Sequence, residues 1–143
     1  MAPQPEENVP VITNVFASKE LRPGDTWKVF LGAQAPDGDM KRIVCTLEQP
    51  GSGQGLSFIK IREGRRGRLS GHIFLNTETG SGVPFASCRL TLQIQDKKGN
   101  FSNSVSLTLS LNPQAVRQSP PPGIFEDEEL GPVQIRFPTP PGP

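Results

Sequence analysis

The 143-residue sequence lacks tyrosine, has one tryptophan and one histidine, and contains no long uninterrupted apolar run. A membrane-spanning helix needs roughly 18 or more consecutive apolar residues, so we expect no membrane span. The formal net charge is +1, which is too small to attract nucleic acid or an anionic membrane. A single histidine with no metal-binding or nucleophilic partner near it in sequence builds neither a zinc site nor a catalytic site. We therefore expect a chain that is not an enzyme.

Prolines divide the chain into three parts. Most of the 16 prolines lie near the two ends, and the residues between them are rich in Val, Ile, Leu, Phe and Thr. Pro-rich segments are extended and stiff, whereas the central part has enough apolar residues for a core. We expect a flexible lead at 1–10, one folded domain at 11–112 and a proline-rich tail at 113–143.

Apolar and polar residues alternate with a period of two across the central part, in short runs separated by Gly, Pro, Asp and Asn. This alternation is typical of strands with one buried face. Trp27 and Val29 share one such face, and Leu90 and Leu92 share another. The glycine-rich residues 50–55 are expected to form a loop. The runs cover residues 12–18, 26–33, 41–47, 56–62, 69–76, 85–96 and 101–111.

Seven short strands without a helix must bury their apolar faces by pairing into two sheets packed face to face. The sequence therefore predicts an all-β fold, an immunoglobulin-like antiparallel β-sandwich of about seven strands. Tight turns are expected at 36–39 (PDGD) and 97–100 (KKGN), because Pro, Gly, Asp and Asn adopt the backbone angles that turns require.

Three short motifs resemble those of bacterial immunoglobulin-like and cadherin-like repeats. They are LRPGDT at 21–26, APDGD at 35–39 and LQIQDKKGNFS at 92–102. The resemblance covers about residues 11–111 and implies an exported β-sandwich module that serves as a spacer, an adhesion module or an attachment to an enzyme. It also implies an extracytoplasmic location, whether periplasmic, cell-surface or secreted, with a signal sequence removed ahead of Met1. The alternative is a cytosolic chain.

Four oxygen-bearing residues are candidate ligands for calcium: Asp37, Asp39, Asp96 and Asn100. They occupy two turns that an immunoglobulin-like sandwich places at the same end. Calcium takes six to eight hard oxygen ligands of this kind. The alternative explanation is that Asp and Asn occur here because they favour tight turns, and neighbouring lysines would oppose a divalent cation. No other cofactor is expected.

The two cysteines, Cys45 and Cys88, are expected on neighbouring strands of one sheet, both facing inward. A disulfide would require them to lie opposite each other in register, because their α-carbons must be within about 7 Å. Without that register they are buried free thiols that pack as small apolar side chains. Both possibilities remain open from the sequence.

Two other features have a structural and a functional interpretation. His72 lies in the middle of a predicted strand, and we expect it on the outward, exposed face. The basic turn Arg65, Arg66 and Arg68 is expected to be solvated and to protect a sheet edge from pairing. Contact of this turn with acidic polysaccharide or phosphate is the alternative.

The tail contains a segment shaped like a strand. In residues 132–138, Val133, Ile135 and Phe137 alternate with Gln134 and Arg136. Such a segment is able to add to an exposed sheet edge. It docks on this domain, joins a partner, or is a linker that stays unfolded.

The expected function is that of a non-catalytic structural or protein-interaction module of an exported or cell-surface bacterial protein. Its partner would be another protein or a neighbouring domain. The alternative is an accessory carbohydrate-binding domain, stabilised by calcium. Trp27 is the only tryptophan available for a sugar platform, and its position in the alternation places it inward.

Overall fold

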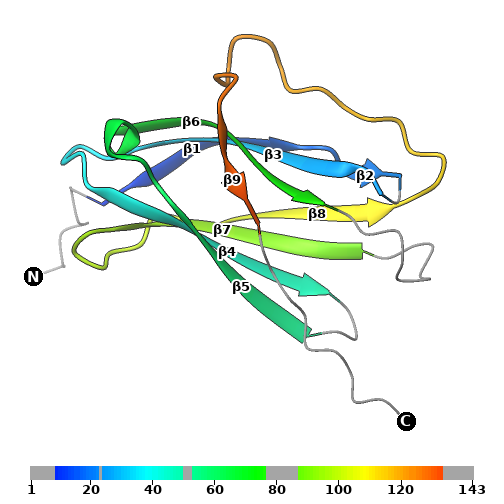
Figure 1. Ribbon diagram of the computed structural model, residues 1–143, viewed down its shortest axis with the longest axis horizontal. Coiled ribbons are helices and arrows are strands. Elements are labelled where there is room, and N and C mark those ends of the chain that lie inside the picture. Colours follow the sequence, from blue (N-terminus) through cyan, green and yellow to red (C-terminus); the bar gives the residue numbers. More distant parts are fainter. Residues whose placement is uncertain (1–8, 23, 50–52, 77–86, 134–143) are drawn as a thin grey trace, which may run out of the picture.

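The computed structural model describes residues 9–22, 24–49, 53–76 and 87–133, and its strands form two sheets packed face to face (Figure 1). Sheet A has four strands in the order β1-β3-β6-β9, and sheet B has five in the order β2-β8-β7-β4-β5. The predicted all-β sandwich is confirmed. The described part contains no helix that is long and apolar enough to cross a membrane. The elements are β1 (Val11–Ala17), β2 (Glu20–Leu21), β3 (Thr26–Gln34), β4 (Met40–Gln49), β5 (Gly53–Lys60), η1 (Glu63–Arg65), β6 (Arg68–Asn76), β7 (Ser87–Asp96), β8 (Val105–Leu111) and β9 (Glu129–Pro132).

The core lies between the two sheets and is built from the alternating faces that the sequence predicts. Trp27 and Val29 of β3 are completely buried, as are Leu90 and Leu92 of β7. The indole Nε1–H of Trp27 donates a hydrogen bond of 2.9 Å to the carbonyl oxygen of Ser18. This bond satisfies the one polar group that a buried tryptophan brings into an apolar interior.

Both predicted turns form, and in each a glycine supplies the left-handed backbone. Gly38 has a φ of 63° and Gly99 a φ of 90°. The Gly38 N–H donates to the carbonyl of Ala35, and the Gly99 N–H donates to the carbonyl of Asp96, each at 3.1 Å. These turns connect β3 to β4 and lead from β7 back toward β8.

Most strand boundaries differ from the prediction by one or two residues, and the starts of two strands differ by three or more. Strand β5 begins at Gly53, so the expected loop is wrong at 53–55, while 50–52 lie outside the described residues. Gly55 pairs with Leu47 because the ten-residue strand β4 offers a ladder that outweighs the low strand propensity of glycine. Strand β8 begins at Val105 rather than at 101. The Ser102 hydroxyl accepts a hydrogen bond of 2.8 Å from the Ile94 N–H, and this side-chain bond interrupts the backbone ladder. The expected strand start at 85 and 86 also lies outside the described residues.

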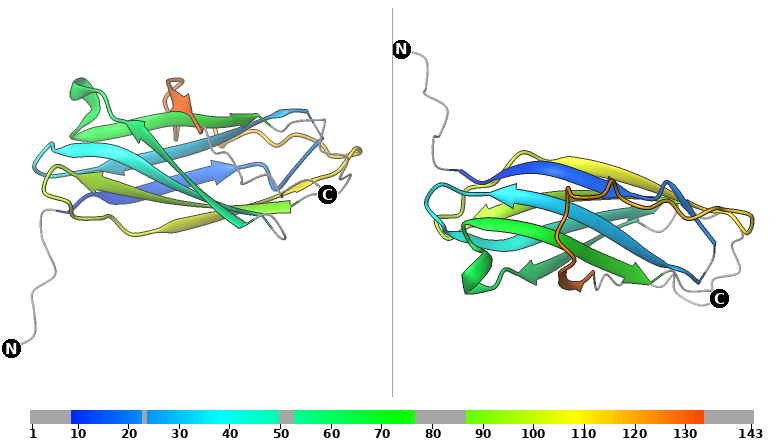
Figure 2. Two further views of the ribbon diagram at one scale, coloured as in Figure 1. Left: turned by 60° about the horizontal axis from the view of Figure 1, so that its bottom comes forward. Right: turned by 90° about the horizontal axis from the view of Figure 1, so that it is seen from above.

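Residues 113–128 form a strap that follows β8 and crosses the outer face of sheet A (Figure 2). The Phe125 ring lies 5.7 Å from the Phe30 ring, measured between centroids. The Glu126 N–H donates to the Ser70 hydroxyl at 2.9 Å, and the His72 N–H donates to the Glu128 carbonyl at 2.8 Å. The strap therefore covers part of a face that the alternation alone assigns to solvent.

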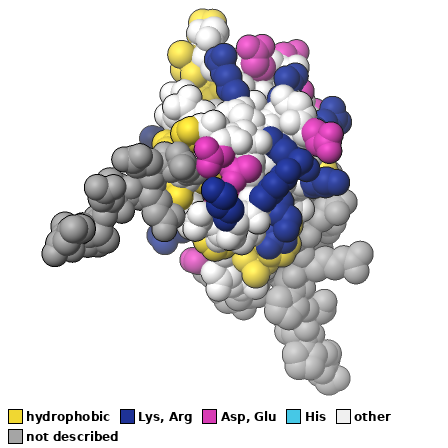
Figure 3. All heavy atoms as spheres, turned by 90° about the vertical axis from the view of Figure 1, so that its left-hand side faces the viewer, with side chains coloured by type: hydrophobic (Ala, Val, Ile, Leu, Met, Phe, Trp, Pro, Cys, Tyr) yellow, Lys and Arg dark blue, Asp and Glu magenta, His cyan; other side chains and the backbone are white. Residues whose placement is uncertain are grey.

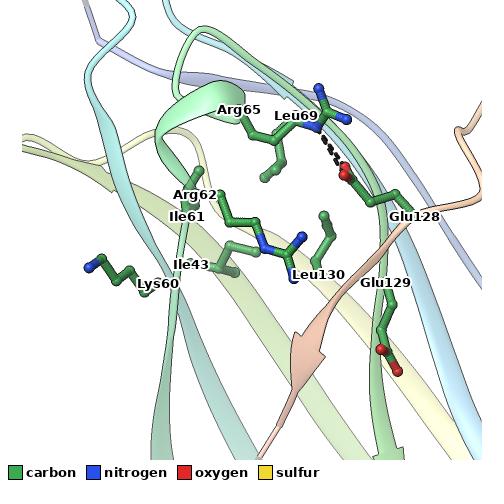
Figure 4. Close-up of a pocket in the computed structure, with 9 residues that line it drawn as sticks. All are labelled: Ile43, Lys60, Ile61, Arg62, Arg65, Leu69, Glu128, Glu129 and Leu130. Carbon is green, nitrogen blue, oxygen red and sulfur yellow. Dashed lines mark hydrogen bonds and ion pairs between the residues drawn. The ribbon is translucent and has the colours of Figure 1, made fainter.

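At the end of the strap, β9 pairs in parallel with β6 and closes one side of the sandwich. Leu130 packs against the core, and Val133 is 6 % exposed within it. Gly131 also lies against the side chain of Ile59 on β5. Figure 4 shows Leu130 among the side chains that reach this side from β4, β5 and β6. Strand β9 thus fills the opening between the β6 and β5 edges.

The strand expected at 132–138 overlaps β9 only at Pro132, and residues 134–138 lie outside the described residues. Strands β2 and β9 were not expected where they occur. A two-residue strand such as β2 shows no periodicity, and β9 contains a glycine and a proline, which strand interiors usually lack.

Candidate functional site

The four calcium candidates lie at one end of the sandwich, as the topology predicts. The Lys97 N–H donates to the Asp39 carbonyl at 3.0 Å, and the Lys98 ammonium lies 3.5 Å from the Asp37 carboxylate. These contacts join the turn after β3 to the turn after β7. The two turns are therefore held together by one backbone hydrogen bond and by the ammonium of Lys98.

The Asp96 carboxylate is occupied by its own turn. It accepts hydrogen bonds from the Lys98 N–H at 3.0 Å and the Asn100 N–H at 2.8 Å, and the Asn100 amide lies 3.4 Å away. Asp39 offers one buried oxygen, Oδ1, that has no hydrogen-bond partner among the described residues. Within that part of the chain, no three His, Cys, Asp or Glu side chains form a group able to hold a metal. The observed contacts make Asp96 a turn-capping residue.

Lys and Arg side chains gather at this end of the molecule (Figure 3). Arg65 of the basic turn forms an ion pair with Glu128 of the strap, with its Nε 2.8 Å and 3.0 Å from the two carboxylate oxygens (Figure 4). This hydrogen bond raises the pKa of Arg65 and lowers the pKa of Glu128. One arginine of the expected basic turn therefore binds the chain's own tail.

The two cysteines are free thiols in the structure. Cys45 lies opposite Leu92, and Cys88 lies opposite Leu109, so the register does not bring the two thiols together. Burial raises the pKa of Cys45 to about 12 and that of Cys88 to about 11. A thiol is nucleophilic only as the thiolate, so both cysteines are unreactive packing residues near neutral pH.

The expectation that His72 is exposed is wrong, because its side chain is 8 % exposed. The ring faces outward from sheet A, but the strap passes over it and the ring edge packs on Phe30 with 5.3 Å between centroids. Burial, followed by the charge of Lys28, lowers the pKa of His72. No local pattern in the sequence indicates this contact, since it depends on a tail more than 50 residues away along the chain.

A cavity of about 170 Å³ lies between the strap and the outer face of sheet A. Phe16 and Phe30 form its apolar part, and Lys28 and Arg117 provide cations. Arg117 is already paired with Asp25 at 3.6 Å. Ligand pockets usually occupy about 300–1,000 Å³, so this cavity is too small to hold most metabolites.

The largest exposed apolar side chains within a described strand lie together on the outer face of sheet B. Leu56 is 59 % exposed and Phe58 is 52 % exposed, both on β5. Phe58 pairs across the ladder with Val44 of β4. The Arg42 guanidinium lies 4.3 Å from the centroid of the Phe58 ring, in a cation–π contact. We call this surface, formed by Arg42, Val44, Leu56 and Phe58, the β5 face.

Strand β5 is also an open edge, since β4 is its only strand neighbour among the described residues. The Ile61 N–H donates to the Lys41 carbonyl at 3.0 Å, which identifies a hydrogen-bonded pair. Such pairs alternate along an antiparallel ladder, and the β4–β5 register is unshifted. The odd-numbered residues of β5 therefore bond to β4. The backbone groups that point to the open edge belong to Gln54, Leu56, Phe58 and Lys60.

The alternation in 56–62 separates Leu56 and Phe58 from Ile59 and Ile61 but does not say which pair is buried. The structure buries Ile59 and Ile61 and exposes the other two. The sequence thus predicts a strand with apolar residues on both faces. When such a strand lies at an edge of the sheet, the exposed apolar face is typical of an interaction surface.

Comparison with protein-family models, with curated proteins and with solved structures finds no match for this chain. The function is therefore inferred from the surfaces of the sandwich itself.

Proposed function

We propose that this chain is a non-catalytic protein-interaction module of an exported or cell-surface bacterial protein, and that it binds its partner through the β5 face and the neighbouring β5 edge. The observation that carries the proposal is the combined exposure of Leu56 and Phe58 beside an edge backbone that pairs with no further strand among the described residues. Apolar side chains supply contact energy and edge backbone supplies hydrogen bonds, which is how extended segments are recognised on sheets.

We propose further that the sandwich is of the immunoglobulin-like type. Strands β1, β3 and β6 share one sheet, and β4, β7 and β8 share the other, which is the distribution of the A, B, E and C, F, G strands in that fold. The turn motifs at 21–26, 35–39 and 92–102 add the resemblance to bacterial exported repeats, which is the support for an extracytoplasmic location.

The carbohydrate-binding alternative has less support. Trp27 is fully buried and donates its indole N–H within the core, so it offers no platform for a sugar ring. Phe58 is an exposed aromatic ring, but the Arg42 guanidinium lies against it. A protein surface with apolar side chains fits the β5 face better.

Site-specific photo-crosslinking in the source organism tests the proposal. A photoreactive phenylalanine analogue replaces Phe58 or, as a matched control, Phe101, which is 47 % exposed and lies outside the β5 face. We expect a discrete crosslinked adduct from position 58 and none from position 101, in the cell-envelope fraction. Equal labelling at both positions, or none at position 58, would contradict the proposal. An adduct found only in the cytosolic fraction would contradict the location.

A further inference from the structure

We infer that the partner at the β5 edge is a second copy of this chain, which pairs β5 with β5 in antiparallel orientation and joins the two five-stranded sheets into one. This inference rests on the proposed function, because it names the partner of the same surface. It predicts a symmetric dimer in which the same residues contribute on both sides, as a two-fold interface requires.

The open edges of the sandwich differ in how well they are protected. Strand β1 has a register shift between Ile12 and Asn14, and β2 is only two residues long. Bulges and short edge strands are devices that prevent strand addition. Strand β5 is eight residues long, pairs with β4 without a shift, and contains no proline. It is the edge among the described strands that lacks such protection.

Strand β9 does not occupy this edge. Strand β9 is bonded to β6 in sheet A, and it meets β5 through the inward-facing side chain of Ile59. The backbone groups of Gln54, Leu56, Phe58 and Lys60 point along sheet B, away from β4. No other strand of the described residues pairs with them, so they can bond to a further strand.

Backbone complementarity limits the register of the pair. The edge groups belong to even-numbered residues, so a two-fold pair must place even residues opposite even residues. Placing Leu56 opposite Phe58 of the other copy satisfies this condition, with Ser57 on the two-fold axis. In this register Leu56 of each copy contacts Phe58 of the other, so all four exposed apolar side chains are paired. A shift by two residues in either direction leaves a Phe58 or Leu56 side chain opposite Gln54 or Lys60.

The same register matches the charges at the ends of the interface. Lys60 of one copy then lies opposite Gln54 of the other. The Gln54 amide is 3.5 Å from the Glu48 carboxylate of its own chain, so each Lys60 approaches a Glu48 across the interface. Cross-strand pairs of opposite charge stabilise a sheet, whereas like charges destabilise it.

The first test measures molecular mass over a concentration series. The monomer mass is 15.5 kDa, and sedimentation equilibrium of the purified full chain is expected to approach twice that mass at high concentration. Phe58→Glu is expected to shift the monomer–dimer equilibrium toward monomer by at least tenfold. Phe101→Glu, the same change on another exposed ring, is expected to leave it unchanged. A monomer at all concentrations, or a dimer that Phe58→Glu does not weaken, would overturn the inference.

The second test checks the register. Lys60→Glu places like charges near each other at both ends of the interface and is expected to weaken the dimer about tenfold. The double change Glu48→Lys with Lys60→Glu exchanges the charges and is expected to restore it. Circular dichroism melting of each variant verifies that the monomer remains folded. Failure of the double variant to restore association would rule out this register.

The two proposals fail differently. If the purified chain is monomeric and position 58 crosslinks to another protein, the second copy is wrong and the interaction role stands. If position 58 crosslinks to nothing, both fail. A crosslink between two copies of the chain supports both.

Discussion

At the scale of single residues, environment rather than residue type determines what a side chain does in this sandwich. Trp27, the aromatic residue best suited to a sugar platform, is fully buried and hydrogen-bonded to Ser18. His72 faces outward from its sheet and is still buried, because the strap covers it. The carboxylate of Asp96, a candidate metal ligand, accepts hydrogen bonds from backbone N–H groups of its own turn.

We expect the burial of His72 to make the stability of the fold depend on pH. The pKa of His72 is lowered, first by burial and then by Lys28, while Glu129 and Asp127 act in the opposite direction. The unfolded chain, with an ordinary pKa of about 6.5, binds the proton more readily. The contribution of neutral His72 to the free energy of unfolding is therefore expected to be complete above about pH 6.5. It is expected to be lost as the pH falls from there through the lowered pKa of the folded state.

The variant His72→Gln lacks this titrating group. Its free energy of unfolding, measured with urea between pH 7.5 and 5.5, is therefore expected to change less with pH than that of the natural chain. The Glu128 carboxylate does not interfere in this range, because Arg65 lowers its pKa. Parallel pH profiles for the two proteins would show that His72 is not the group responsible.

At the scale of elements, β9 depends on a single glycine in its neighbour. A Cβ added at Gly71 of β6 would overlap the backbone oxygen of Glu128 and lie 3.1 Å from the Leu130 side chain. A larger residue at this position therefore excludes the strap from its observed path. Gly71 is a position where close approach of a second backbone requires glycine.

Gly71→Ala is expected to release β9 and lower the free energy of unfolding by about 1–3 kcal/mol, the usual cost of overpacking. Hydrogen exchange should show faster exchange at the amides of His72 and Val133, whose N–H groups bond across the β6–β9 contact. Gly64→Ala is the matched control, because a Cβ there meets no atom within 4 Å. Unchanged exchange at His72 and Val133 in Gly71→Ala would contradict the assigned packing.

Long alternating strands were predictable, and elements with tertiary causes were not. Strands β3 and β7 were found because each carries several apolar residues on one face, a local property of the chain. The Gly53–Gly55 segment was missed because its strand state comes from pairing with β4, which local propensity does not report. The sequence showed that β5 has two apolar pairs on opposite faces. Which pair is exposed depends on the position of the second sheet.

At the scale of the whole molecule, the tail is part of the sandwich. The strap covers the outer face of sheet A, and β9 adds Leu130 and Val133 to the core. The Arg65–Glu128 ion pair adds little, because solvent screens the two charges of an exposed pair. The apolar contacts of β9 are therefore the main stabilising contribution of the tail.

Truncation before Ile124 removes the second half of the strap and β9. The shortened chain is expected to lose about 2–4 kcal/mol of unfolding free energy, because two apolar side chains are no longer buried. The ordering entropy that the removed segment no longer costs offsets part of this loss. Chemical unfolding of both chains measures this loss. Equal stability would show that β9 does not contribute to the fold.

The geometry of the acidic turns predicts that calcium does not stabilise the domain. Asp96 is committed to its turn, and Lys97 and Lys98 lie at the same end. The melting temperature is expected to be the same in millimolar Ca²⁺ and in chelator. An increase with Ca²⁺ that Asp39→Asn abolishes would reverse this conclusion.

The sequence by itself determined the sandwich, its main strands, the two glycine turns and the inward direction of Trp27. All of these follow from alternation and turn chemistry, which act between neighbours along the chain. The tertiary structure decided the burial of His72, the β9 strand, the separation of the two cysteines and the exposure of Leu56 and Phe58. These depend on which segments meet across long chain separations, and no local pattern of residues encodes that choice.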